Sequence, residues 1–126
     1  MTTITEDYVS FETAKLLKKK GFDEACWSWY HNGNNTHTGT SRYCNSELEK
    51  YDFSKPTLAH VMKWLREVHK IYIDISPTYS ETEKTMHFIW QIFDSNYDGV
   101  GDCEIFYSKY ETACEEAIKY CLENLI

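Results

Sequence analysis

The fold is decided by residues 71–107, which read IYIDISPTYSETEKTMHFIWQIFDSNYDGVGDCEIFY. Every second residue from 71 to 75 is isoleucine, and this period of two predicts a strand with one face turned inward. Alternation of the same kind covers 85–93 and 102–107. Pro77 should end the first strand, because proline lacks the N–H that a sheet interior requires. The three runs together predict an antiparallel meander.

Helical periodicity flanks this meander on both sides. Downstream, residues 108–111 (SKYE) have the spacing of a capping box, and apolar residues then recur every three or four positions to Leu125. Upstream, Pro56 and Thr57 open a second helix that should end near His69.

The N-terminal part adds a helix and a strand. Ser10 can cap a helix over 10–20, and Gly21 is a suitable left-handed terminator. Residues 25–31 (ACWSWYH) alternate like a strand, which places Trp27, Trp29 and His31 on one face and Cys26, Ser28 and Tyr30 on the other. The polar stretch 32–46 has no period and predicts a long loop. The predicted order is α-β-α-β-β-β-α. We therefore expect one α+β domain over 1–126, with a small, mainly antiparallel sheet of about four strands and three helices on one face.

Charge and composition narrow the classes of partner. The 126 residues carry 13 Lys plus Arg against 20 Asp plus Glu, a net charge of −7, which argues against nucleic acid as a partner. No apolar run approaches the roughly 18 residues of a membrane span, so no membrane partner is expected. An odd number of cysteines (5) and a polar, acidic start favour a cytoplasmic location.

One segment begins like a calcium-binding loop. Asp94, Asn96 and Asp98 occupy its first, third and fifth positions, and a glycine follows at the sixth. Gly101 and Ile105 stand at the eighth and twelfth positions, where such a loop needs a branched apolar residue and a glutamate. We therefore expect at most a weak calcium site and favour a hairpin turn.

Neither a cofactor nor a catalytic site is predicted. The sequence has no Cys-x-x-Cys and no His-x-x-x-His pair. Cys44 is the one cysteine expected on a loop, with Arg42 nearby and His37 seven residues away, so a reactive thiol is an alternative. No nucleophile elbow and no phosphate-binding glycine loop occurs. The expectation is a protein that is not an enzyme.

Aromatic residues are the most informative feature, at 16% of the chain. Alternation places them on both faces of the strands, so a sheet covered by helices on one face would expose rings on the other. The candidate protein-binding residues are Trp27, Trp29, Tyr30, Tyr72 and Trp90. A sheet covered on both faces, with these rings in the core, is the alternative.

A second candidate function is binding of a small, nucleotide-like ligand. The aromatic rings would stack on a base, and basic side chains would meet the phosphates. The candidate phosphate-binding residues are Arg42, Lys63 and Arg66.

Three segments carry a resemblance to a family: 7–23 (DYVSFETAKLLKKKGFD), 56–69 (PTLAHVMKWLREVH) and 110–126 (YETACEEAIKYCLENLI). They resemble a family of small uncharacterised proteins common in Bacteroides genomes, their phages and mobile elements. The resemblance implies a bacterial cytoplasm and phage or mobile-element cargo, without a catalytic assignment. We therefore expect an accessory protein that binds a host or phage protein, and a homo-oligomer is compatible with that role.

Overall fold

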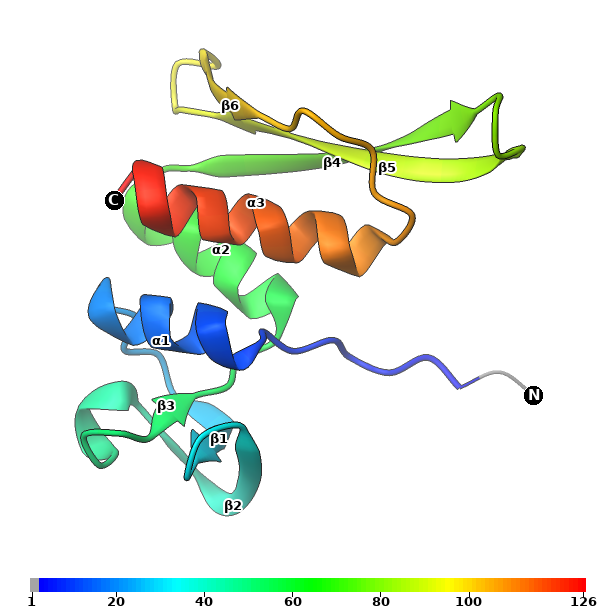
Figure 1. Ribbon diagram of the computed structural model, residues 1–126. Coiled ribbons are helices and arrows are strands. Elements are labelled where there is room, and N and C mark those ends of the chain that lie inside the picture. The colour runs from blue at the N-terminus through cyan, green and yellow to red at the C-terminus, as the bar shows by residue number, and fades with distance from the viewer. Residues whose placement is uncertain (1–2) are drawn as a thin grey trace. The chain divides into compact units, whose positions relative to one another are not determined.

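A computed structural model describes residues 3–126 and shows three α-helices and two three-stranded sheets (Figure 1). The chain divides into two compact units, with the boundary between Leu58 and Ala59. The predicted α+β class is confirmed. The single sheet of about four strands is wrong, because the strands form two separate sheets, one from residues 26–54 and one from residues 72–102. The predicted order α-β-α-β-β-β-α lacks two of the strands in the first sheet. A single domain over 1–126 stays a prediction.

Helix α1 (Phe11–Lys19) lies one residue inside the predicted range 10–20 at each end. The Ser10 side chain accepts a hydrogen bond from the Thr13 backbone N–H, which caps the first turn. At the other end, Gly21 has a φ of +91°, and the Phe22 N–H donates to the Leu17 carbonyl at 2.9 Å. This left-handed ending is the Schellman arrangement predicted from the glycine.

The first sheet consists of β1 (Cys26–His31), β2 (Asn35–Tyr43) and β3 (Phe53–Ser54), all antiparallel, and a short 3₁₀ helix η1 (Asn45–Glu47) precedes β3. Helix α1 packs on one face of this sheet. The ring of Phe11 meets those of Tyr30 and Phe53 edge to face, with centroids 5.5 and 5.8 Å apart. The face that carries the odd-numbered residues of β1 is therefore turned away from α1.

The predicted loop over 32–46 is wrong, because most of it is strand β2. Asn32 and Gly33 both have positive φ (52° and 79°), so they turn the chain back onto β1. Strand β2 is exposed along almost its whole length, so burial imposes no apolar alternation on its sequence. Backbone pairing with β1, rather than side-chain pattern, makes it a strand.

Helix α2 (Leu58–His69) leads into the second unit and ends where predicted. The antiparallel meander that follows is confirmed, with strands β4 (Tyr72–Ser80), β5 (Thr85–Phe93) and β6 (Gly99–Asp102). The third strand lies earlier than the predicted 102–107, because the turn after β5 is short. Only Tyr107 of the later residues pairs again, in an isolated bridge with Phe88.

Pro77 does not end its strand, which continues to Ser80. Strand β4 lies at the edge of the sheet, where Pro77 stands opposite Phe88. Phe88 exchanges both of its backbone hydrogen bonds with Tyr107, on the side away from β4. Pro77 therefore occupies a non-hydrogen-bonded position, and its missing N–H leaves no partner unsatisfied.

Helix α3 (Tyr110–Asn124) packs against one face of the second sheet. The ring of Trp90 meets that of Tyr120 at 5.2 Å. The buried helix residues are those of the predicted apolar stripe: Ala113, Cys114, Ala117, Ile118, Cys121 and Leu122. The predicted capping box is wrong, because the N-cap is Lys109 and its side chain makes no capping bond, which leaves Ser108 one position too early.

Within residues 3–126, none of the helices combines the length and apolar character needed to cross a bilayer.

Candidate functional site

The candidate site is the face of the first sheet turned away from α1. Alternation along β1 was predicted to place Trp27, Trp29 and His31 together. Trp27 is 54% exposed and the other two are half-buried, while Cys26 and Tyr30, on the opposite face, are buried. This division confirms the predicted faces of the strand.

Two rings, those of His37 and Tyr43, continue this face onto β2. Trp29 lies opposite His37 in the register, and their rings stack at 6.2 Å with 21° between the planes. The His37 ring meets His31 edge to face at 4.9 Å, and Trp29 meets Tyr43 in the same way at 5.5 Å. The rings therefore form one continuous row of His31, His37, Trp29 and Tyr43.

Trp27 lies beside this row with a cation above it. The Arg42 guanidinium carbon is 6.0 Å from the centre of the Trp27 ring. Both side chains are exposed, which leaves them accessible to a ligand. We call the six residues of this surface the β1–β2 aromatic face: Trp27, Trp29, His31, His37, Arg42 and Tyr43.

Gly39 lets the Trp29 ring lie close to the strand. A Cβ atom at position 39 would come 3.0 Å from two carbon atoms of the indole, tighter than an ordinary contact. The register shifts between Cys26 and Ser28, so β2 carries extra residues here, and Tyr43 pairs with Cys26 beyond that bulge. From there the Tyr43 ring reaches the Trp29 ring that Gly39 admits.

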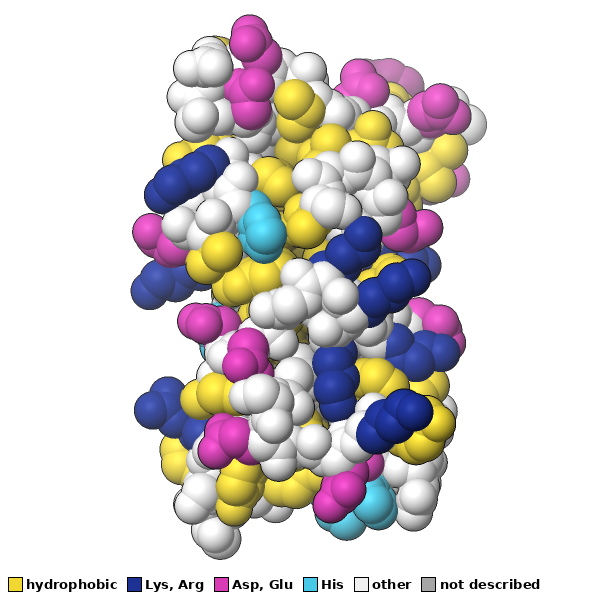
Figure 2. All heavy atoms as spheres, turned by 90° about the vertical axis from the view of Figure 1, so that its left-hand side faces the viewer, with side chains coloured by type: hydrophobic (Ala, Val, Ile, Leu, Met, Phe, Trp, Pro, Cys, Tyr) yellow, Lys and Arg dark blue, Asp and Glu magenta, His cyan; other side chains and the backbone are white. Residues whose placement is uncertain are grey.

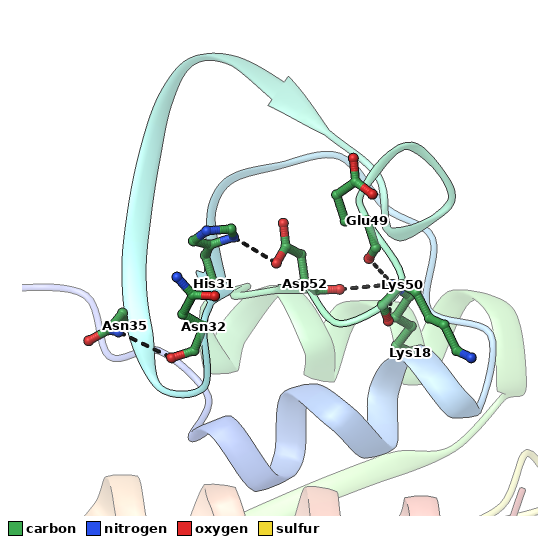
Figure 3. Close-up of polar contacts among 7 residues, drawn as sticks. All are labelled: Lys18, His31, Asn32, Asn35, Glu49, Lys50 and Asp52. Carbon is green, nitrogen blue, oxygen red and sulfur yellow. Dashed lines mark hydrogen bonds and ion pairs between the residues drawn. The ribbon is translucent and has the colours of Figure 1, made fainter.

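A buried carboxylate orients one end of the face (Figure 3). His31 Nδ1 lies 2.8 Å from Oδ1 of Asp52, whose residue is only 8% exposed. Because a carboxylate only accepts, Nδ1 carries the proton in this bond. Lys18 Nζ donates to the backbone carbonyls of Asp52, Glu49 and Lys50, at 2.8, 2.9 and 3.3 Å, and so holds the segment that carries the carboxylate.

Two of the candidate binding residues are not surface groups. Tyr30 is 6% exposed, and its hydroxyl donates to the Val9 carbonyl at 2.6 Å. Trp90 is 5% exposed and packs against α3. Exposure was the premise of both assignments, and it is wrong for both residues, because each lies on the helix-covered face of its sheet.

The remaining candidates divide between the two units. Arg42 joins Trp27 in the first unit. Lys63 and Arg66 are exposed on α2, and Tyr72 is 39% exposed on β4, in the second unit.

The segment that begins like a calcium loop is a hairpin turn between β5 and β6. Oδ1 of Asp94 accepts hydrogen bonds from the backbone N–H groups of Asn96 and Asp98, at 2.9 and 3.0 Å. Within residues 3–126, no group of three or more His, Cys, Asp or Glu side chains is arranged to hold a metal ion. The Asp94 carboxylate thus stabilises the turn, as Asp does in Asx turns.

The surroundings of Cys44 do not favour a reactive thiol. Partial burial, followed by a hydrogen bond to Glu47 and the negative charges of Asp23 and Glu47, raises the pKa of Cys44. A catalytic thiol needs a lowered pKa, because the thiolate is the nucleophile. His37, the base considered for it, instead contacts Trp29 and His31.

We expect the cysteines to divide into two groups by how readily their thiols react with iodoacetamide in the native protein. Cys26, Cys114 and Cys121 are buried, and burial raises the pKa of Cys26 to about 11 and that of Cys121 to about 12. At pH 8 we expect the native protein to be alkylated only at the half-buried Cys44 and Cys103, counted by mass, and at all 5 cysteines in denaturant. Fast labelling of Cys121 in the native protein would contradict the packing of α3.

The chain matches no protein-family model, no curated protein and no solved structure.

Sequence reasoning found the β1 half of this face and missed the β2 half. The residues missed are His37 as a ring contact, Tyr43 and Asp52. An Asn-Gly pair between alternating residues is a hairpin signal, and Asn32-Gly33 after β1 could have indicated the paired strand.

Proposed function

We propose that this protein is a non-enzymatic binding protein and that the β1–β2 aromatic face is its contact surface for a protein partner. The observation that carries the proposal is the exposed pair of Trp27 and Arg42 beside the ordered row of rings. Tryptophan, tyrosine and arginine are the residues enriched at the energetic centres of protein interfaces. All three occur here in two contacting pairs, Trp29 with Tyr43 and Trp27 with Arg42.

The face is also ordered before any partner arrives. Asp52 orients His31, the stack with His37 fixes Trp29, and Gly39 lets the indole lie close to the strand. Side chains already held in place lose less conformational entropy on binding, so more of the contact energy becomes affinity. A phage or mobile-element context, with a host or phage protein as the partner, follows from the resemblance described above and belongs to the same proposal.

A nucleotide-like ligand is the second candidate, favoured by the same Trp27–Arg42 pair. A base could stack on the indole while the guanidinium meets a phosphate. The experiment below separates the two candidates by the mass of what is bound.

Trp27→Ala should abolish capture of the partner without unfolding the protein. Truncating a residue at the centre of an interface costs about 2 kcal/mol or more of binding free energy, whereas changing an exposed side chain alters stability by about 0.5 kcal/mol or less. Tagged wild type and variant are compared by pull-down from a Bacteroides lysate, native mass spectrometry of the eluate and thermal melting. We expect a stoichiometric protein in the wild-type sample alone.

Tyr51→Ala is the matched control. Tyr51 is 72% exposed in the same unit and also has a cation near its ring, Lys50 at 5.3 Å, but it is not part of the aromatic face. Equal loss of capture in both variants, or capture retained by Trp27→Ala, would overturn the assignment of the face. An adduct of a few hundred daltons that depends on Trp27 would favour the nucleotide-like ligand.

A further inference from the structure

The second unit contains a hollow of about 530 Å³ that the proposed function does not use. It lies at the end of the sheet where β4 begins and β5 ends. Three of the side chains in its wall are aromatic: Tyr72, Phe93 and Tyr97. Two are carboxylates, Asp74 and Asp94.

Two of the three rings are stacked, and the third lies on the same face of the sheet. Tyr72 and Phe93 are directly paired across β4 and β5, so their side chains lie on the same face of the sheet. The ring of Tyr97 stacks on that of Phe93 with 4.7 Å between centroids and 19° between planes. Tyr97 is 80% exposed and Tyr72 is 39% exposed, so their rings are accessible.

The charge in the wall is entirely negative. Within the described residues, the hollow is lined by no lysine, arginine or histidine. Asp94 is held by two backbone N–H groups of its turn, and Oδ2 of Asp74 accepts from the Ser76 hydroxyl at 3.0 Å. Figure 2 shows acidic side chains beside hydrophobic ones at its upper end.

The turn after β5 places the backbone of Tyr97 in a left-handed conformation. Its φ is +63°, in the left-handed region where glycine or asparagine is usual after such a turn. A tyrosine there costs free energy, of the order of 1 kcal/mol, that a glycine would not. The exposed ring of Tyr97 contributes little to a core. The residue with the unfavourable backbone conformation is thus one whose side chain lines the hollow.

The geometry points to a binding site for a methylated ammonium group. Faces of aromatic rings attract cations, and adjoining rings around a quaternary ammonium are a recurrent way of recognising it. A trimethylammonium group has no N–H to satisfy. This suits the carboxylates of Asp74 and Asp94, which accept hydrogen bonds from the protein and would act on the ligand through their charge. Tyr72 belongs to this site rather than to the protein-binding face.

The test is titration of the full chain with choline and with its neutral isostere 3,3-dimethylbutan-1-ol, followed by NMR of the ligand methyl groups and of the tyrosine rings. We expect choline to bind at least about tenfold more tightly than the alcohol. Equal binding would show an apolar hollow without cation recognition, and no binding of choline would leave no site. Either result overturns the proposal.

Tyr97→Gly separates binding from structure. The variant removes the ring and relieves the left-handed strain, so choline binding should fall at least about tenfold while the melting temperature holds or rises. Tyr79→Ala is the control, because Tyr79 is 49% exposed on the same strand but its side chain lies on the opposite face from Tyr72. Unchanged binding by Tyr97→Gly would refute the site.

The charge is tested in the same way. Asp74→Asn should weaken choline binding, whereas Glu81→Gln, which makes the same charge change at the far end of the β4–β5 hairpin, should not. A peptide that contains trimethyllysine distinguishes two sources of the ligand. Tighter binding of the peptide than of choline indicates a modified protein, and weaker binding indicates a free choline-like molecule.

Discussion

Trp90→Ala should lower the free energy of unfolding by about 3–5 kcal/mol, the usual loss when a buried Trp or Phe is truncated to Ala. The Trp90 side chain is buried, its ring packs against Tyr120 of α3, and its Nε1 donates to the Tyr107 hydroxyl at 3.4 Å. Truncation would leave a cavity between the sheet and the helix and remove that hydrogen bond. Urea unfolding followed by circular dichroism measures the change.

Trp27→Ala deletes the same side chain at an exposed position and serves as the comparison. Its unfolding free energy should stay within about 0.5 kcal/mol of wild type. Equal losses of unfolding free energy in the two variants would contradict either the burial of Trp90 or the exposure of Trp27. The two variants also separate an effect on stability from an effect on binding. Trp90→Ala should reduce partner capture only because it unfolds the protein, whereas Trp27→Ala should reduce it only because a contact with the partner is lost.

Asn45→Ala should destabilise the protein by about 2–4 kcal/mol. Asn45 is 5% exposed and bridges two segments, since its Nδ2 donates to the Phe22 carbonyl at 2.8 Å and its Oδ1 accepts from the Ser54 N–H at 2.9 Å. Alanine would leave both backbone groups without this partner in a buried place, and each such group costs about 1–3 kcal/mol.

The matched variant is Asn35→Ala, which removes an exposed amide that donates only to the Asn32 carbonyl. It should change the unfolding free energy by less than about 0.5 kcal/mol in the same urea titration. A loss below 1 kcal/mol for Asn45→Ala would mean that water or another group replaces the bridge.

The elements that could be predicted are those in which one side of the chain is buried. Helix α1 has its cap, its apolar residues and its glycine ending all within a short stretch, and β1 alternates between a helix-covered face and an open one. Strand β2 could not be found by the same pattern, because it is exposed along almost its whole length. The division into two sheets depends on which strands pair, and periodicity does not report pairing.

Only the part of the candidate site that lies on β1 could be predicted from the sequence. Alternation placed Trp27, Trp29 and His31 together, and the register then adds His37. Tyr43 and Asp52 come onto the face through a bulge and through a segment held by Lys18, neither of which leaves a signal in local sequence. Tyr30 and Trp90 were misplaced because aromatic content does not show which face of a sheet a helix covers.

Pro77 also limits what can add to the second sheet. Strand β4 is nine residues long and forms an open edge, which in other proteins can template an incoming strand or a growing fibril. The outward-facing backbone nitrogen of Pro77 has no hydrogen to offer, so an added strand would lose a bond in the middle of the edge. Self-assembly by strand addition is therefore discouraged at β4.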